Sequence, residues 1–483
     1  MLFLEFMSYQ FSNIQNLQND LKSGKTTCVK LTEEALQLAE QRKNLNAFLE
    51  VFKESALQKA KEVDEKIKSG KAGRLAGVIV GLKDNICYKG HKVSCSSKIL
   101  ETFESLYSAT VVERMLAEDA IILGRCNCDE FAMGSSNENS AFGNVLNPLN
   151  EKCVPGGSSG GAAAAVAANI CHVTLGSDTG GSIRQPASFC GVVGFKPTYG
   201  RVSRWGLVAY ASSFDQIGPL TKTVEDTALI FEIISGADEF DGTMSKKEVE
   251  KYYENSSKPN KKYKIAYLKD CIEANGLDPE VKKGTLATIE KLKAAGHTLE
   301  PVDFPFLDYL VPVYYVLTTA EASSNLSRFD GVHYGYRSKN ATDLESTYKK
   351  SRSEGFGKEV KRRIMLGTFV LSAGYYDAYY SKGQKVRKLL QQKTEEIFKN
   401  YDFIVTPSTP GTAFEFGKNS KDPIKMYLED IFTVQANIVG IPAISVPNGL
   451  HSNGLPIGFQ IMGKAFSETE LLKLAKEVED LKK

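Results

Sequence analysis

The sequence reads GGSSGG at residues 156–161 and DTGGSIR at residues 178–184, which places serines in two glycine-lined turns. Glycines let backbone N–H groups approach a substrate closely, as the stabilisation of an oxyanion requires. The two turns therefore indicate hydrolysis or acyl transfer.

The segments around these turns predict the fold class. Residues 161–169 form an alanine-rich helix whose small side chains permit close packing on a sheet, and residues 76–82 and 171–175 are typical of short buried strands. Strands alternating with helices predict an α/β fold, with a large parallel or mixed sheet covered by helices on both faces. The same pattern predicts further strands at 120–123, 263–268, 403–405, 443–446 and 457–461, and helices at 109–119, 279–295 and 467–481.

The chain divides into a helical lead-in over residues 1–70, packed on the core, and a main domain over residues 71–483. The lead-in is rich in Leu, Ala, Glu, Lys and Gln, which favour helix. Within the main domain, residues 245–262 are polar and Lys-rich, and we expect a solvated connector there.

Composition limits the possible partners. The 60 Lys and Arg against 58 Asp and Glu leave a formal charge of +2, which provides no overall field to recruit nucleic acid. Nine cysteines without a CxxC pair suit a reducing cytoplasm, and Cys126-Asn127-Cys128 is too tight for the usual zinc spacing, so we expect no metal site.

The sequence predicts neither a membrane span nor a signal peptide. No window reaches the ~18 apolar residues of a membrane span. Glu5 interrupts the apolar start, so we expect no signal peptide, and translation could begin at Met1 or Met7.

The GGSSG segment also matches the G-x-S-x-G nucleophile elbow of α/β-hydrolases, in which Ser158 would attack with the help of a later Asp and His. Two features count against this interpretation. Residues 147–155 are typical of a loop where that fold needs a strand, and the second serine turn is left without a role. His172, one of only five histidines, lies in an apolar strand where a structural role is expected.

Lys83 is the alternative base, because it directly follows a predicted buried strand. A desolvated lysine loses its proton more readily than one in water, and a neutral amine can accept the proton of a serine. The competing interpretation is a surface lysine paired with its neighbour Asp84.

The motifs GLKDN (81–85), DEFAMG (129–134), VPGGSSGG (154–161), GSDTGGSIRQP (176–186) and GFKPTYGRVS (194–203) resemble those of the amidase signature enzymes. Further segments resemble the tRNA-dependent amidotransferase A subunits within that family, namely 324–331, 351–357, 360–364 and 374–380. The resemblance implies the amidase signature fold, a large mixed sheet covered by helices on both faces.

The resemblance also implies a Ser-Ser-Lys triad, with Ser182 as the acyl nucleophile, Ser158 as the bridging serine after a cis Gly157–Ser158 peptide, and Lys83 as the base. The backbone amides of 179–182 would hold the oxyanion. These residues are Thr179, Gly180, Gly181 and Ser182.

A glutamine substrate is implied in the same way, with Arg363 and Asp430 pairing with its α-carboxylate and α-amine and Tyr314 nearby. From the residues alone, Arg363 could equally lie on a solvated basic helix face with Lys361 and Arg362. Asp430 could be a simple helix first-turn acid.

In this family branch the A subunit releases ammonia from glutamine. A B subunit uses ATP and Mg²⁺ to activate misacylated Glu-tRNA or Asp-tRNA, and a small C subunit stabilises the heterotrimer. The resemblance thus implies no cofactor on this chain and tRNA contact mainly through the B subunit. Two other functions stay open: a free-standing amidase for small or fatty amides, and a catalytically idle scaffold.

Overall fold

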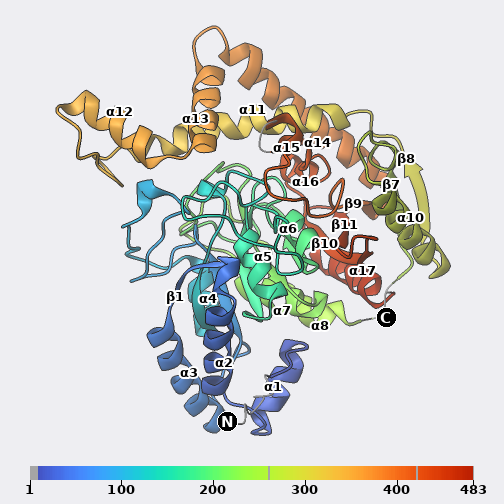
Figure 1. The fold of residues 1–483 in the computed structure, drawn as a ribbon. Helices are drawn as coiled ribbons and strands as arrows, with labels where there is room; N and C mark the ends of the chain where they lie inside the picture. The colour runs from blue at the N-terminus through green and yellow to red at the C-terminus, as the bar shows by residue number, and fades with distance from the viewer. Residues whose placement is uncertain (1–8, 259–260, 420–422, 482–483) are drawn as a thin grey trace.

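The structure is a computed structural model that describes residues 9–258, 261–419 and 423–481 (Figure 1). The alternative starts Met1 and Met7 lie outside these residues. Eleven strands form one sheet in the order β1-β3-β2-β4-β6-β5-β10-β11-β9-β7-β8. They are β1 (Phe48–Val51), β2 (Ile79–Lys83), β3 (Ile121–Cys126), β4 (Val173–Asp178), β5 (Val193–Lys196), β6 (Gln216–Thr221), β7 (Lys264–Leu268), β8 (Thr298–Val302), β9 (Phe403–Pro407), β10 (Ala443–Leu450) and β11 (Pro456–Gly463).

The sheet is mixed, as predicted. The pairs β2–β3, β2–β4, β7–β8 and β7–β9 are parallel, whereas β4–β6, β5–β6 and the strands from β5 through β10 and β11 to β9 pair antiparallel.

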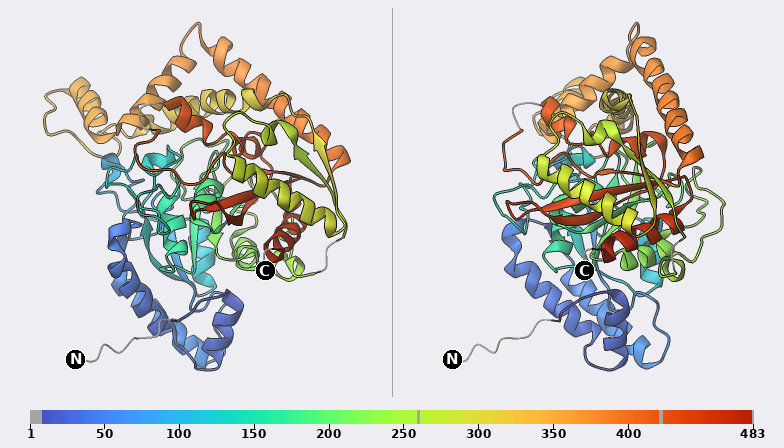
Figure 2. Two further views of the ribbon diagram at one scale, coloured as in Figure 1. Left: turned by 45° about the vertical axis from the view of Figure 1, so that its right-hand side comes forward. Right: turned by 90° about the vertical axis from the view of Figure 1, so that its right-hand side faces the viewer.

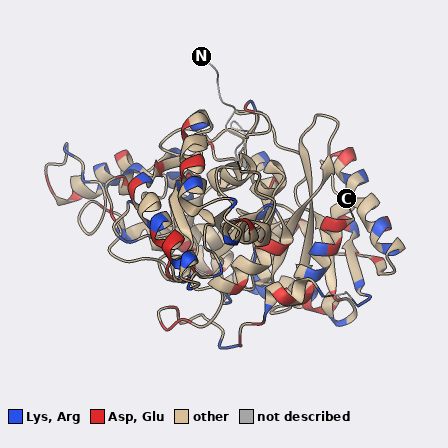
Figure 3. Ribbon diagram, turned by 90° about the horizontal axis from the view of Figure 1, so that it is seen from below, with Lys and Arg blue, Asp and Glu red and all other residues tan. Residues whose placement is uncertain are grey.

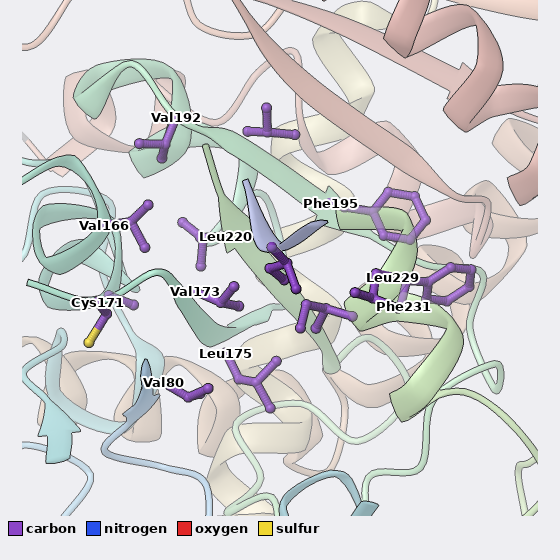
Figure 4. Close-up of a cluster of buried hydrophobic side chains, with 14 of the residues drawn as sticks. Val80, Val166, Cys171, Val173, Leu175, Val192, Phe195, Leu220, Leu229 and Phe231 are labelled. Carbon is purple, nitrogen blue, oxygen red and sulfur yellow. The ribbon is translucent and has the colours of Figure 1, made fainter. Parts of the chain in front are cut away.

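Helices cover both faces of the sheet, again as predicted. In β9, Phe403 and Val405 join a buried cluster with residues of α10 and α17, whereas Ile404 between them joins a second cluster with residues of α11 and α14. Alternate residues of a strand point to opposite faces, so the two clusters lie on the two sides of the sheet. The first cluster includes side chains of β2, β4, β5 and β6 together with α5 and α7 (Figure 4).

The α-helices and the π-helix η5 have the following bounds: α1 (Ile14–Lys22), α2 (Cys28–Gln41), α3 (Lys53–Lys68), α4 (Thr110–Ala117), α5 (Gly160–Ala167), α6 (Arg184–Cys190), α7 (Val224–Ile234), α8 (Tyr252–Ser256), α9 (Lys269–Ile272), α10 (Pro279–Ala294), α11 (Leu307–Asn325), α12 (Leu344–Gly355), α13 (Lys358–Leu371), η5 (Tyr376–Ser381), α14 (Lys382–Asn400), α15 (Pro423–Leu428), α16 (Val434–Val439) and α17 (Glu468–Asp480). Short 3₁₀ turns are η1 (Lys43–Leu45), η2 (Lys98–Leu100), η3 (Glu130–Ala132) and η4 (Leu326–Arg328). Helices α11 to α14 form a layer at one end of the molecule, and α1 to α3 lie at the other (Figure 2). Among the described residues, none of the helices combines the length and the apolar composition that a membrane span requires.

The topology brings the chemical motifs together. Strands β2 and β4 are parallel neighbours, so their carboxyl ends, with Lys83 and Asp178, meet at the same edge of the sheet. The two serine turns lie directly before α5 and α6. The strand predicted at 171–175 begins two residues later, at Val173.

The N-terminal segment is mostly helical, but it also supplies β1, which pairs antiparallel with β3 at the edge of the sheet. Leu17, Leu31 and Val63, one from each of α1, α2 and α3, are buried in the same cluster as the strands. The lead-in therefore shares both the sheet and a hydrophobic core with the rest of the chain.

The polar stretch 245–262 is only partly a solvated connector. Lys246 and Lys251 are exposed as expected. However, Tyr252 in α8 is buried, and the guanidinium of Arg201 donates to its hydroxyl and to the carbonyls of Lys247 and Glu248 at 2.5 to 2.8 Å. The expectation of a solvated segment is wrong for Tyr252 and for the backbone of Lys247 and Glu248, because a buried arginine from the core anchors them.

Candidate active site

Lys83 is fully buried at the end of β2, and its amine contacts two serine hydroxyls. Nζ lies 2.6 Å from Oγ of Ser158 and 2.9 Å from Oγ of Ser177. Asp84 instead pairs with Arg125, whose Nη1 is 2.9 Å from Oδ1. The interpretation of Lys83 as a surface lysine paired with Asp84 is therefore wrong.

The surroundings of Lys83 favour a neutral amine. Burial lowers its pKa from the usual lysine value, although the acidic groups of Cys128, Asp129 and Asp178 act in the opposite direction. Hydroxyl partners can donate to a neutral amine as well as accept from a charged one.

A second buried lysine, Lys196 at the end of β5, provides a contrast. Its Nζ donates to the carbonyls of Pro197 and Ile441 at 2.9 and 2.6 Å, and carbonyls can only accept. Burial, followed by the charge of Arg184, lowers the pKa of Lys196 to about 7. Of the two amines, only that of Lys83 contacts hydroxyls that can pass a proton.

The two serine turns contact each other through their backbones. The N–H of Ser159 donates to the carbonyl of Ser182 at 3.2 Å, and the Gly157–Ser158 peptide is cis, as the family resemblance implies. Ser182 is 7% exposed, and its Oγ has no hydrogen-bond partner within the part of the chain that the structure describes. Its hydroxyl is therefore available to a substrate.

The nucleophile-elbow interpretation finds no support in the structure. No strand runs through 147–155 before Ser158. His172 has a structural role: its Nδ1 accepts from the N–H of Ile79 at 3.1 Å and its ring stacks on Phe11 at 4.2 Å. Burial lowers the pKa of His172 to about 3, so the ring is neutral at physiological pH.

The second serine turn is built around Asp178. Its carboxylate accepts from Nε and Nη2 of Arg184, each at 3.0 Å, and from the N–H groups of Gly181 and Ile183 at 2.8 and 3.2 Å. Burial acts to raise the pKa of Asp178, but Arg184 and further donors hold it at about 2. The ionised Asp178 thus fixes the turn that carries Ser182.

This geometry corrects one expectation about the oxyanion site. The N–H of Gly181 is already bonded to Asp178, so it is not free for an oxyanion. The amides of Thr179, Gly180 and Ser182 donate to no group among the described residues. Gly181 matters instead for its backbone, because φ is +130° and a Cβ there would collide with Thr433.

Tyr314 from α11 lies directly against the oxyanion turn. A Cβ on Gly180 would collide with the ring of Tyr314, so only glycine fits at this contact. On the other side, Oγ1 of Thr433 donates to the carbonyl of Gly180 at 2.6 Å. The segment that begins at Asp430 and the helix that carries Tyr314 therefore both border the turn.

Arg363 is buried on α13, and its guanidinium is surrounded by polar and aromatic groups. Nε donates to Oε1 of Glu359 and Nη1 to the hydroxyl of Tyr210, both at 2.9 Å. Lys361 is exposed and Arg362 is half-exposed. The solvated-face interpretation holds for these two neighbours but is wrong for Arg363.

Asp430 is also buried, so it is not a simple first-turn acid. It accepts from Oγ of Ser135 at 2.8 and 2.9 Å and from the hydroxyl of Tyr315 at 3.2 Å. Burial raises its pKa to about 7. The ring centroid of Tyr315 lies 5.1 Å from the guanidinium of Arg363, so this tyrosine links the two charged residues.

Sequence reasoning does not identify five residues that complete the site: Ser177, Ser135, Tyr210, Tyr315 and Glu359. Ser177 and Ser135 lie in or beside the quoted motifs, so adjacency is the one signal that could have found them. Tyr210 is 153 positions from Arg363 and carries no local signal. Across the described segments, no group of three or more His, Cys, Asp or Glu could hold a metal ion.

Comparison with known proteins places this geometry in a family. The amidase family profile matches residues 30–472. The A subunit of the glutamyl-tRNA(Gln) amidotransferase of Chlorobium phaeobacteroides is 51% identical over 96% of this chain and 98% of its own length. The solved structure of a protein of the same name from Thermotoga maritima has a TM-score of 0.78 at 40% identity, covering 99% of this chain and 96% of that one. A peptide amidase from Stenotrophomonas maltophilia has a TM-score of 0.80 at 28% identity, covering 98% and 97%. The chain belongs to the amidase family.

Proposed function

We propose that this chain is the glutamine-hydrolysing A subunit of a tRNA-dependent amidotransferase. The observation that carries the proposal is the buried contact of Lys83 with Ser158, beside the turn of Ser182. The same turn is bordered by Tyr314 and Thr433, and Arg363 and Asp430 are buried on the segments that carry or contact these residues. Relatives that bear the A-subunit name, at about half identity over nearly the whole chain, support the same conclusion.

The reaction begins with proton transfer. Neutral Lys83 takes a proton from Ser158, which takes one from Ser182, and Oγ of Ser182 attacks the side-chain amide carbon of glutamine. The free amides of Thr179 and Gly180 stabilise the oxyanion. The proton then returns through Ser158 to the leaving nitrogen, ammonia departs, and water hydrolyses the glutamyl ester on Ser182.

A free-standing amidase is the alternative, and fold does not decide between the two, because the peptide amidase and the Thermotoga protein match this chain with similar TM-scores. The two buried charged residues, Arg363 and Asp430, favour glutamine. A buried guanidinium suits an α-carboxylate, and a buried carboxylate suits an α-amine. A simple or fatty amide has neither group.

The partners proposed for this chain are the B and C subunits, with ATP, Mg²⁺ and the misacylated tRNA bound mainly by B. The formal charge of +2 supports this division, and acidic and basic residues alternate along many of the helices of the ribbon in Figure 3. All nine cysteines are free and buried, which supports a cytoplasmic location.

The test is ammonia release by the chain reconstituted with its B and C partners. We expect release from glutamine and transfer to Glu-tRNA(Gln), and assays with Asp-tRNA(Asn) will determine whether both tRNAs are used. Hydrolysis of simple amides without any release from glutamine would instead identify a free-standing amidase. An intact complex without hydrolysis of either substrate would identify a scaffold.

Replacing Arg363 by Lys should lower kcat/KM for glutamine by about 10- to 150-fold. The substitution keeps the charge beside Glu359 but removes one hydrogen bond to a charged group, worth about 1.5–3 kcal/mol. Hydrolysis of a simple amide should be unchanged. Arg362→Lys, at the preceding position, is the matched control. An equal loss of kcat/KM for glutamine in both variants would rule out the assigned role of Arg363.

A further inference from the structure

Glu130 is a buried acid outside the chemistry described above. It lies in η3, in the DEFAMG segment, and is 2% exposed. Oε2 and Oε1 accept from the N–H of Gly357 at 2.8 and 3.1 Å, and Oε1 also accepts from Oγ of Ser97. A buried carboxylate needs such partners, so these contacts fix its place.

Gly357 is the N-cap residue of α13, the 14-residue helix that carries Arg363. It has no side chain that could cap the helix, and Glu130 supplies a carboxylate there from a distant part of the chain. Negative charge at a helix N-terminus is favourable. A Cβ at residue 357 would collide with Oε2 of Glu130, so the contact requires glycine.

The neighbours of Glu130 and Gly357 pack against each other as well. The ring of Phe131 lies 5.6 Å from that of Phe356 and 5.2 Å from that of Phe329. A Cβ at residue 355 would lie 2.5 Å from Cδ1 of Ile99, which is too close for a carbon–carbon contact. Residues 130–131 and 355–357 thus form a tight joint between the catalytic core and α13, called here the α13 joint.

Asp129, next to Glu130, holds the loop that contacts Asp430. Its carboxylate accepts from the N–H groups of Asn137 and Asn139 at 2.9 and 3.1 Å. This fixes the loop in which Ser135 donates to Asp430. Asp129 is therefore connected to Asp430 through this loop, whereas Glu130 is connected to Arg363 through α13.

We infer that Glu130 is a positioning residue that orients Arg363 for the α-carboxylate of the substrate by holding Gly357, the N-cap residue of α13. The inference rests on the proposed function, since it assigns the α-carboxylate of glutamine to Arg363. Arg363 follows Gly357 by less than two turns of a continuous helix, so a shift at the α13 joint moves the guanidinium directly. A displacement of about 1 Å from a remote change can cost up to about 100-fold in rate.

The test is Glu130→Gln in the reconstituted complex, assayed with glutamine and with a simple amide that lacks an α-carboxylate. The amide of the new side chain has one acceptor oxygen where the carboxylate uses two, and it carries no negative charge at the N-terminus of α13. We expect KM for glutamine to rise about five- to twentyfold, with kcat within about twofold and the simple amide unaffected. Gly357→Ala, which disturbs the same contact from the other side, should give the same pattern.

Glu354→Gln is the matched control, because Glu354 lies on the exposed side of the same junction and bonds Tyr336 and Ser338 instead. It should leave both KM values unchanged. The inference would be overturned by an unchanged KM for glutamine in Glu130→Gln and Gly357→Ala, or by an equal loss of activity with glutamine and with the simple amide. In either case, glutaminase activity of the wild-type complex would still support the proposed function. A wild-type complex inactive on glutamine would refute both.

Discussion

Ser182→Ala should lower kcat for glutamine hydrolysis by about four to six orders of magnitude and leave the fold intact. The substitution removes the atom that forms the acyl-enzyme bond, whereas the turn itself is held by Asp178 through backbone groups and Arg184. The measurement is ammonia release in the reconstituted complex, with circular dichroism and thermal unfolding to confirm folding.

Ser188→Ala is the matched control, since Ser188 is also buried, on the helix that follows, and its Oγ lies 3.3 Å from Oγ1 of Thr409. It should retain activity. Trapping the acyl-enzyme and mapping the added mass distinguishes the two serines. A glutamyl group on Ser158, or a fully active Ser182→Ala, would reverse the assignment of nucleophile and bridging residue.

The sequence permits prediction of the strands and helices around the site because local patterns specify them. Strands β2 and β4 are short apolar runs, and α5 is a run of small helix formers. Strand β6 has no such pattern: it contains Gly218 and Pro219, and it is a strand because it pairs with β4 on one side and β5 on the other. Similarly, α11 contains Pro312, which argues locally against a helix.

Within the site, the family motifs identify Lys83, Ser158 and Ser182, but not what surrounds them. The motifs do not show that Lys83 contacts Ser177, or that the N–H of Gly181 donates to Asp178. Both contacts depend on the directions of the side chains at the end of β4. The roles of Tyr210 and Glu130 arise from contacts between residues far apart in the chain. Such contacts follow from tertiary packing, and no local pattern encodes them.

Lys83→Met should abolish glutamine hydrolysis to about the same extent as loss of Ser182, because groups that act as one relay are not additive. Methionine has nearly the volume of lysine, so it leaves no cavity, and the main cost to stability is the lost partner of the Ser158 and Ser177 hydroxyls, about 1–3 kcal/mol each. Lys83→Arg should be equally inactive, because a guanidinium stays charged. Substantial activity in either variant would exclude Lys83 as the base.

The pH dependence separates the base from a merely buried lysine. The relay needs the neutral amine, so kcat/KM should rise with pH through the pKa of Lys83, and burial moves this rise below the pH at which an exposed lysine titrates. Lys196 also has a lowered pKa, so Lys196→Met is the control. It deprives the carbonyls of Pro197 and Ile441 of a donor and should lower stability by about 1–3 kcal/mol per carbonyl, yet leave the midpoint of the pH profile in place. A midpoint that disappears in Lys196→Met would assign the titration to Lys196 instead. Asp430, with a pKa of about 7, could also titrate in the glutamine profile, so the midpoint is compared with that of a simple amide, which has no α-amine for Asp430. A midpoint shared by both substrates and unchanged in Lys196→Met leaves Lys83, whose amine contacts hydroxyls, as the group that must lose its proton.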